Sequence, residues 1–175
     1  MKSLTTILAN VREDYGLSPM FELYEWLDAK VVRSGIESLT RPGRAIFLVQ
    51  RYDGDMAQGG YETLITWDRT LGIMPMIAAL REVGAPRTAG VLTDLASLFP
   101  SGTIPDNAEL RWREYRDLVP PRRQRKRMQW ALRCAQRAED VCQLCLEHAR
   151  HNLVELRAEN AELGAAPDCG GGTAS

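Results

Sequence analysis

Two cysteines and two histidines near the C-terminus have the residue types and the spacing of metal ligands. Cys142, Cys145, His148 and His151 follow one another at intervals of three residues, and zinc and copper prefer thiolate and imidazole ligands. The segment has helical periodicity, which places residues i and i+3 on one face and residues i and i+9 on opposite faces. The candidate metal ligands are therefore Cys142, Cys145 and His148. Burial of the cysteines as small apolar side chains explains the same pattern without a metal, and we expect no cofactor.

Catalytic groups are scarce in the chain. Both histidines lie in this one segment, so candidates for a general base are few. A pair formed by Cys145 and His148 on an apolar helix face is expected to be buried rather than reactive. The chain contains no Gly-x-Ser-x-Gly turn, no phosphate-binding glycine loop and no His-Glu-x-x-His motif. We therefore predict that the protein is not an enzyme.

The segment from Asp53 to Glu62, with the sequence DGDMAQGGYE, is the most unusual of the chain. Paired glycines between two helical patterns predict a sharp turn, because glycine adopts backbone conformations that other residues avoid. A calcium loop starting at Asp53 requires an oxygen ligand at its fifth position and a glutamate at its twelfth. Ala57 and Leu64 occupy these positions, so the segment is not a calcium loop. A solvated turn at a helix end is the alternative to a functional role.

A basic run follows the paired prolines at 120–121. Residues 111–137 carry ten basic and two acidic side chains, a net charge of +8, whereas the whole chain has a net charge of −1. Like charges at helical spacing repel, and cations are unfavourable at the start of a helix. The run is therefore predicted to face acidic groups of its own fold, a second protein or nucleic acid. For nucleic acid the candidate residues are Arg122, Arg123, Arg125, Lys126 and Arg127, with Arg111, Arg113 and Arg116 as an extension and Trp112, Tyr115 and Trp130 for base stacking.

The elements that must position these residues are helices. Apolar residues recur with the helical period over about 19–31, 42–56, 77–83 and 86–99, a further helix is expected over 107–118, and no segment keeps the two-residue period of a strand. From Pro121 to about Leu163 no glycine or proline intervenes, and one apolar stripe runs through this stretch. We predict an all-α, single-domain helical bundle over residues 1–163 with a long C-terminal helix and a flexible tail over 164–175. The apolar stripe of the long helix would also suit pairing of two copies in a homodimer.

The segment DGDMAQGGYETLITW resembles the Asn-Gly-Gly-Phe-x-Gln-Phe-Phe-type signature of the bacterial DNA-mimic-protein-19-like family. Gln58 stands where the family usually has Asn, Tyr61 where it has Phe, and Glu62 where it has Gln. The similarity covers about residues 45–111 well and the C-terminal helix loosely. Its other elements are an Ala-Leu pair, a Gly-Ala helix break, and a Phe-Pro-x-Gly-x-x-Pro turn followed by an arginine, which correspond to Ala79-Leu80, Gly84-Ala85, Phe99-Pro100, Gly102, Pro105 and Arg111.

The resemblance implies an all-helical fold and binding to a transcription factor in place of DNA. It also makes the glycine turn the candidate partner-binding surface, formed by Asp53, Asp55, Gln58, Gly59, Gly60, Tyr61 and Glu62.

Composition agrees with a globular protein. Of the 175 residues, 45% are hydrophobic and 26% charged, which is close to the average of globular domains. No apolar run is long enough to cross a bilayer, and the start of the chain lacks a signal-peptide cleavage site, so we expect a cytoplasmic protein. The function predicted from the sequence is an interaction protein that binds and modulates a partner protein, either a DNA-binding regulator or a toxin. Nucleic-acid binding through 111–127 and metal binding are the alternatives.

Overall fold

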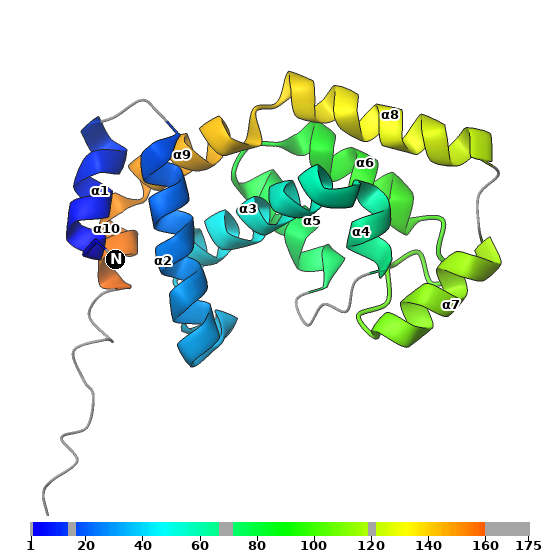
Figure 1. Ribbon diagram of the computed structural model, residues 1–175, viewed down its shortest axis with the longest axis horizontal. Coiled ribbons are helices and arrows are strands. Elements are labelled where there is room, and N and C mark those ends of the chain that lie inside the picture. Colours follow the sequence, from blue (N-terminus) through cyan, green and yellow to red (C-terminus); the bar gives the residue numbers. More distant parts are fainter. Residues whose placement is uncertain (1, 14–16, 67–71, 119–121, 160–175) are drawn as a thin grey trace, which may run out of the picture.

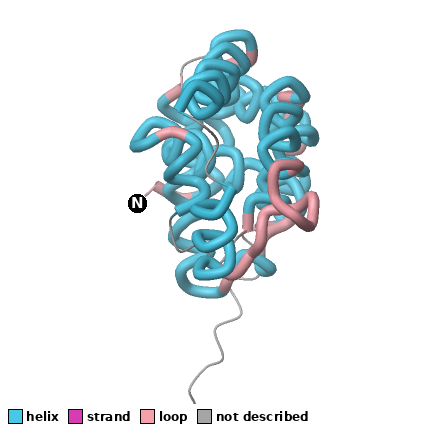
Figure 2. The backbone as a smooth tube through the Cα atoms, turned by 90° about the vertical axis from the view of Figure 1, so that its right-hand side faces the viewer, coloured by secondary structure: helices cyan, strands magenta, loops and turns pink. Residues whose placement is uncertain are grey.

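The computed structural model describes residues 2–13, 17–66, 72–118 and 122–159 (Figure 1). All regular elements in these ranges are helical, as Figure 2 shows from the side, so the predicted all-α fold is confirmed. The tail predicted over 164–175 lies outside the described residues. The helices are α1 (Leu4–Glu13), α2 (Ser18–Ser34), the 3-10 turn η1 (Ile36–Ser38), α3 (Arg41–Gly59), α4 (Tyr61–Thr66), α5 (Ile73–Glu82), α6 (Pro86–Ala96), α7 (Ala108–Leu118), α8 (Arg122–Ala138), α9 (Val141–His151) and α10 (Leu153–Ala158).

Helix α3 is the centre of the molecule. Its first three turns are buried on nearly every side, and it packs against α2, α4, α5, α9 and α10. Helices α1, α2 and α10 gather at one end, α7 lies at the other, and α8 runs along one edge, where it packs on α6 (Figure 1). One hydrophobic core extends from Leu4 in α1 to Leu156 in α10. Within the described residues no helix combines the length and apolarity needed to cross a membrane.

A buried ion pair joins the C-terminal end of the described chain to the start of α3. Lys30 Nζ donates to Glu159 Oε2 at 2.7 Å and to the Glu159 carbonyl oxygen at 3.0 Å. The other carboxylate oxygen, Oε1, accepts from the Thr40 backbone N–H at 2.7 Å and from the Thr40 hydroxyl at 2.6 Å. Thr40 is the N-cap of α3, so the carboxylate lies where the helix dipole favours negative charge. Three segments distant in sequence are thereby fixed together.

The continuous C-terminal helix predicted from the sequence is wrong, because the structure divides that stretch into α8, α9 and α10. Asp140 starts α9, since its Oδ1 accepts the Gln143 N–H at 3.0 Å. Asn152 separates α9 from α10, and its side-chain amide donates to the His148 carbonyl at 2.8 Å. Short polar side chains compete in this way with the hydrogen bonds of the helix backbone. The two breaks let the stretch fold back onto the core.

The apolar stripe of this stretch faces the chain's own core. Val141, Cys145, Ala149 and Leu156 are all buried there. A second copy of the chain would therefore have to use a different surface from the helix seam that the sequence indicated.

Candidate functional site

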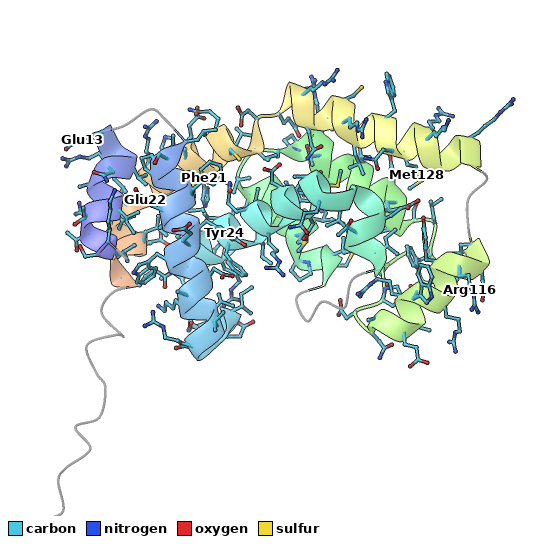
Figure 3. The ribbon with its side chains drawn as sticks, in the orientation of Figure 1. Glu13, Phe21, Glu22, Tyr24, Arg116 and Met128 are labelled. Atoms are coloured by element: carbon cyan, nitrogen blue, oxygen red, sulfur yellow. The ribbon has the colours of Figure 1, made fainter. Side chains whose placement is uncertain are left out.

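The outward face of α8 carries a cluster of cations around one exposed tryptophan. Trp130 is 68% exposed, and five exposed cations lie three, four or seven positions from it, so that they share its side of the helix. Figure 3 shows side chains extending from the upper side of α8, away from the rest of the molecule, while Met128 lies below the helix. We call this surface the cationic face, and its described residues are Arg123, Lys126, Arg127, Trp130, Arg133 and Arg137.

The acidic side chains that the structure describes form no ion pair with this face. None of its five cations forms an ion pair with another side chain in the part of the chain that the structure describes, and residues 122–138 contain no Asp or Glu. The side chains of Arg122 and Arg125, which the sequence also indicated, lie outside the description. The sequence left open whether the basic run is paired within the fold, and for the described cations the structure answers that it is not.

The cationic face differs in extent from the basic patch expected over 111–127. Arg111 is not part of it, because its side chain is 1% exposed. Its Nε donates to the Ile65 carbonyl at 2.7 Å, and one terminal nitrogen donates to the carbonyls of Pro105 and Asp106 at 2.8 and 3.0 Å. Arg111 thus ties the end of α4 to the turn before α7. Sequence reasoning missed Arg133 and Arg137, which continuing the helical spacing beyond Arg127 would have found.

A groove of about 700 Å³ lies between the cationic face and α6. Its walls are two helical stripes, one from α6 and the turn that follows it, and one from α8. Apolar side chains form most of the lining, while two arginines stand on the α8 side and one aspartate on the α6 side. The lining residues are Val91, Asp94, Leu95, Leu98, Arg123, Arg127, Met128 and Ala131.

The segment chosen as the partner-binding surface lies beside α8, but only part of it is surface. Asp55 is 3% exposed. Gly60 is also buried; it has φ +70° and ends α3 as its C-cap, and an added Cβ there would meet the Gln129 side chain of α8 at 2.5 Å. The predicted turn is thus confirmed, with a helix packed against it. Gln58, Gly59 and Glu62 are exposed, Asp53 is half-buried, and the side chain of Tyr61 lies outside the description.

A second hollow, of about 460 Å³, lies between the end of α3 and the C-terminal half of α8. Asp53, Met56 and Ala57 of α3 line one side, and Arg133, Gln136 and Arg137 of α8 line the other. Burial raises the pKa of Asp53, and the hydrogen bond from the Cys142 thiol opposes this shift. The end of α3 that the sequence indicated and the C-terminal half of the cationic face, which it did not, are therefore neighbours on the folded chain.

Two of the candidate metal ligands, Cys142 and His148, lie next to polar side chains of other helices. The Cys142 thiol donates to Asp53 Oδ2 at 3.6 Å and accepts from Gln50 Nε2 at 3.6 Å. His148 Nε2 lies 4.0 Å from Glu82 Oε1 of α5, and burial lowers the pKa of this histidine. Within the described residues no three His, Cys, Asp or Glu side chains come together as a metal would require.

The two thiols of this cluster are also poor nucleophiles. Burial, aided by the nearby Asp53 carboxylate, raises the pKa of Cys142 to about 11. Burial raises the pKa of Cys145 to about 12. Because the thiolate is the reactive form, both cysteines are protonated near neutral pH, Cys145 within the core and Cys142 partly buried at its edge.

Comparison with known proteins identifies one family. The family model described as DMP19-like protein matches residues 37–152. The match extends past the region of about 45–111 in which the sequence resemblance was clearest, and it includes α8 and α9. No curated protein and no solved structure matches the chain at a significant level.

Proposed function

Because the chain belongs to the DMP19-like protein family and presents on α8 five cations that form no ion pair within the described ranges, we propose that it is a non-catalytic interaction protein that binds and modulates a partner protein. The cationic face makes the contact, and the surface that it recognises on the partner is acidic. A cytoplasmic location is part of the proposal.

The observation that carries the proposal is the gathering of cations on one helix face, where none of the five forms an ion pair with a described side chain. The chain has a net charge of −1, so a general excess of positive charge does not explain the cluster. Cations at helical spacing repel one another, and the folded chain supplies no ion pair to offset this cost among the described residues. An acidic surface on a partner offsets it and also speeds association by long-range attraction.

Trp130 gives the face the composition of a binding centre. Tryptophan and arginine are enriched among the residues that dominate the energy of protein interfaces, and Trp130 is exposed among the arginines of this face. The charge also defines the partner's surface. A cationic helix does not reproduce the phosphates of DNA, so the proposed contact is with an acidic surface of a regulator or toxin rather than with a DNA-reading surface.

The test is affinity capture from a lysate of the source cells after nuclease treatment. The bait is compared with the variant R123Q/K126Q/R127Q/R133Q/R137Q, which removes the charge and keeps the helix length. We expect one stoichiometric protein with the natural chain and its loss with the variant. Equal recovery on both baits would refute a role for the cationic face.

Nucleic acid is a second candidate, and the position of Trp130 in the middle of the cationic face favours it. Aromatic side chains among cations stack on the bases of single strands. Five phosphate contacts predict that affinity for a 20-nucleotide single strand falls about 130-fold between 50 and 200 mM salt, and Trp130→Ala should weaken it about 10-fold. Affinity that is indifferent to both changes would end this candidate.

A further inference from the structure

We propose that the groove between α6 and α8 is the docking site for an acidic amphipathic helix of the partner protein. This inference rests on the proposed function and specifies which part of α8 contacts the partner and orients it. It also specifies the chemistry of the segment that occupies the groove.

The two walls have the geometry that receives a third helix. On the α6 side Val91, Asp94, Leu95 and Leu98 follow the spacing i, i+3, i+4 and i+7, and on the α8 side Arg123, Arg127 and Ala131 lie one turn apart. Such paired stripes bind the apolar face of an amphipathic helix at i, i+3, i+4 and i+7.

The floor of the groove is apolar and accessible. Val91, Leu98 and Met128 are only partly buried, although they pack against the core, and Ala131 is likewise partly exposed. Figure 3 shows Met128 on the side of α8 that faces the bundle. Leucine-type side chains of an incoming helix cover this surface, whereas nucleic acid has no aliphatic groups that would fill it. This difference favours a protein segment as the occupant.

The rim sets the charge and the direction of the occupant. Arg123 and Arg127 are four positions apart and stand on the same wall, about 6 Å along the helix axis. Two acidic side chains three or four residues apart on the incoming helix match that separation, and Arg–carboxylate pairs add directional hydrogen bonds. Asp94 on the opposite wall repels acids there. The occupant therefore carries its acids along one flank, next to an apolar stripe.

Selection from a phage library of random 16-residue peptides on the full-length chain tests the inference. We expect enriched peptides with net negative charge and several leucine-type residues. Their affinity should fall about 10-fold or more for Ala131→Phe, which fills the floor, and for R123Q/R127Q, which keeps the floor and removes the rim charges. The matched controls are Ala138→Phe on the same helix and R12Q/R33Q at exposed positions outside the cationic face, and each should change affinity less than about 3-fold. Circular dichroism melting checks that each variant is folded.

Several outcomes would contradict the assignment of the groove as the docking site. These are the absence of enrichment, enrichment without acidic bias, equal binding to Ala131→Phe and the natural chain, or equal losses from the two arginine pairs. In the last case binding depends on net charge alone, so the groove fails, whereas the proposed function is decided by the capture experiment. The proposed function itself fails if the natural chain captures no stoichiometric protein from the nuclease-treated lysate. Displacement of the peptides by a DNA duplex or by a second copy of the chain, with weaker binding of that competitor to Ala131→Phe than to the natural chain, would assign the groove to that occupant instead.

Discussion

Charged side chains fall into two groups in this protein, and their environments give them different roles. Lys30, Glu159 and Arg111 are buried and satisfied by hydrogen bonds that link segments distant in sequence. Arg133 and Arg137 belong to the exposed group on α8, which finds no ion-pair partner within the described residues. The buried group maintains the fold, and the exposed group is available for binding.

Replacement of Lys30 by methionine should destabilise the protein by about 3–5 kcal/mol, because it leaves the Glu159 carboxylate buried without its cation. The matched control is Arg41→Gln, which breaks the exposed Arg41–Glu82 pair (3.1 Å) and should cost less than about 1 kcal/mol. Urea unfolding followed by circular dichroism measures both. Similar small losses in the two variants would mean that the buried pair does not hold α10 in place.

The reactivity of the thiols follows from the raised pKa values. At pH 8 Cys142 and Cys145 should resist alkylation by iodoacetamide, because their pKa values of about 11 and about 12 keep them protonated. Asp53→Asn removes a negative charge that disfavours the Cys142 thiolate, so it should lower that pKa and speed its alkylation. Peptide mapping by mass spectrometry reads each site, with urea-unfolded protein as the control in which both react. Rapid labelling of either cysteine in the native protein would contradict the buried environment.

At the scale of elements, apolar periodicity predicted most of the helices and failed at their ends. The apolar stripe Ala45–Met56 predicted α3. Gly84 predicted the break between α5 and α6, and in the structure this glycine has φ +92°. The breaks at Asp140 and Asn152 were missed because the apolar stripe continues across them, while the capping bonds that interrupt the helix come from single polar side chains.

The candidate site was only partly predictable, because some of its features are local in sequence and others depend on the fold. The basic run is visible in the sequence, but its continuation to Arg137 depends on helix geometry. Whether acids elsewhere in the chain neutralise it depends on tertiary structure. The burial of Arg111 and Asp55 has no local signal, since both lie in segments that read as polar helix surface.

Glu139 is a capping residue supplied from a distant element. Its carboxylate accepts the backbone N–H groups of Arg87 and Thr88 and the Thr88 hydroxyl, each at 2.7 Å, and so closes the start of α6. Glu139→Gln should destabilise the protein by about 1–2 kcal/mol through loss of these charge-assisted bonds. Asp117→Asn, an exposed change of the same kind, should leave the thermal midpoint nearly unchanged. Equal midpoints for the two variants would rule out the cap as a stabilising contact.

At the scale of the whole molecule, one face is set apart by its charge. The bundle is nearly neutral overall, and a single edge helix bears five described cations, with a groove on its α6 side and a hollow on its α3 side. The residues that the DMP19-like family model matches, 37–152, include this helix. The fold is therefore separable from the surface proposed to bind the partner, since the cations contribute no ion pair to the described core.

This separation predicts the stability of the neutralised protein. R123Q/K126Q/R127Q/R133Q/R137Q should unfold at the same temperature as the natural chain or at a slightly higher one, because relief of like-charge repulsion is worth a few tenths of a kcal/mol per pair. Differential scanning calorimetry at low salt gives the comparison. A drop equivalent to several kcal/mol would show that the cations are needed for folding.

The most direct measurement is the dissociation constant between the captured partner and three forms of the full-length chain. These are the natural protein, the five-glutamine variant of the cationic face, and R12Q/R33Q/R87Q/R113Q/R116Q, which removes the same charge from exposed positions elsewhere. We predict about 100-fold weaker binding for the cationic-face variant and less than about 3-fold for the control. Equal losses of affinity in both variants would mean that binding depends on net charge and not on the cationic face. No loss in either variant would contradict the assignment of the cationic face as the binding surface.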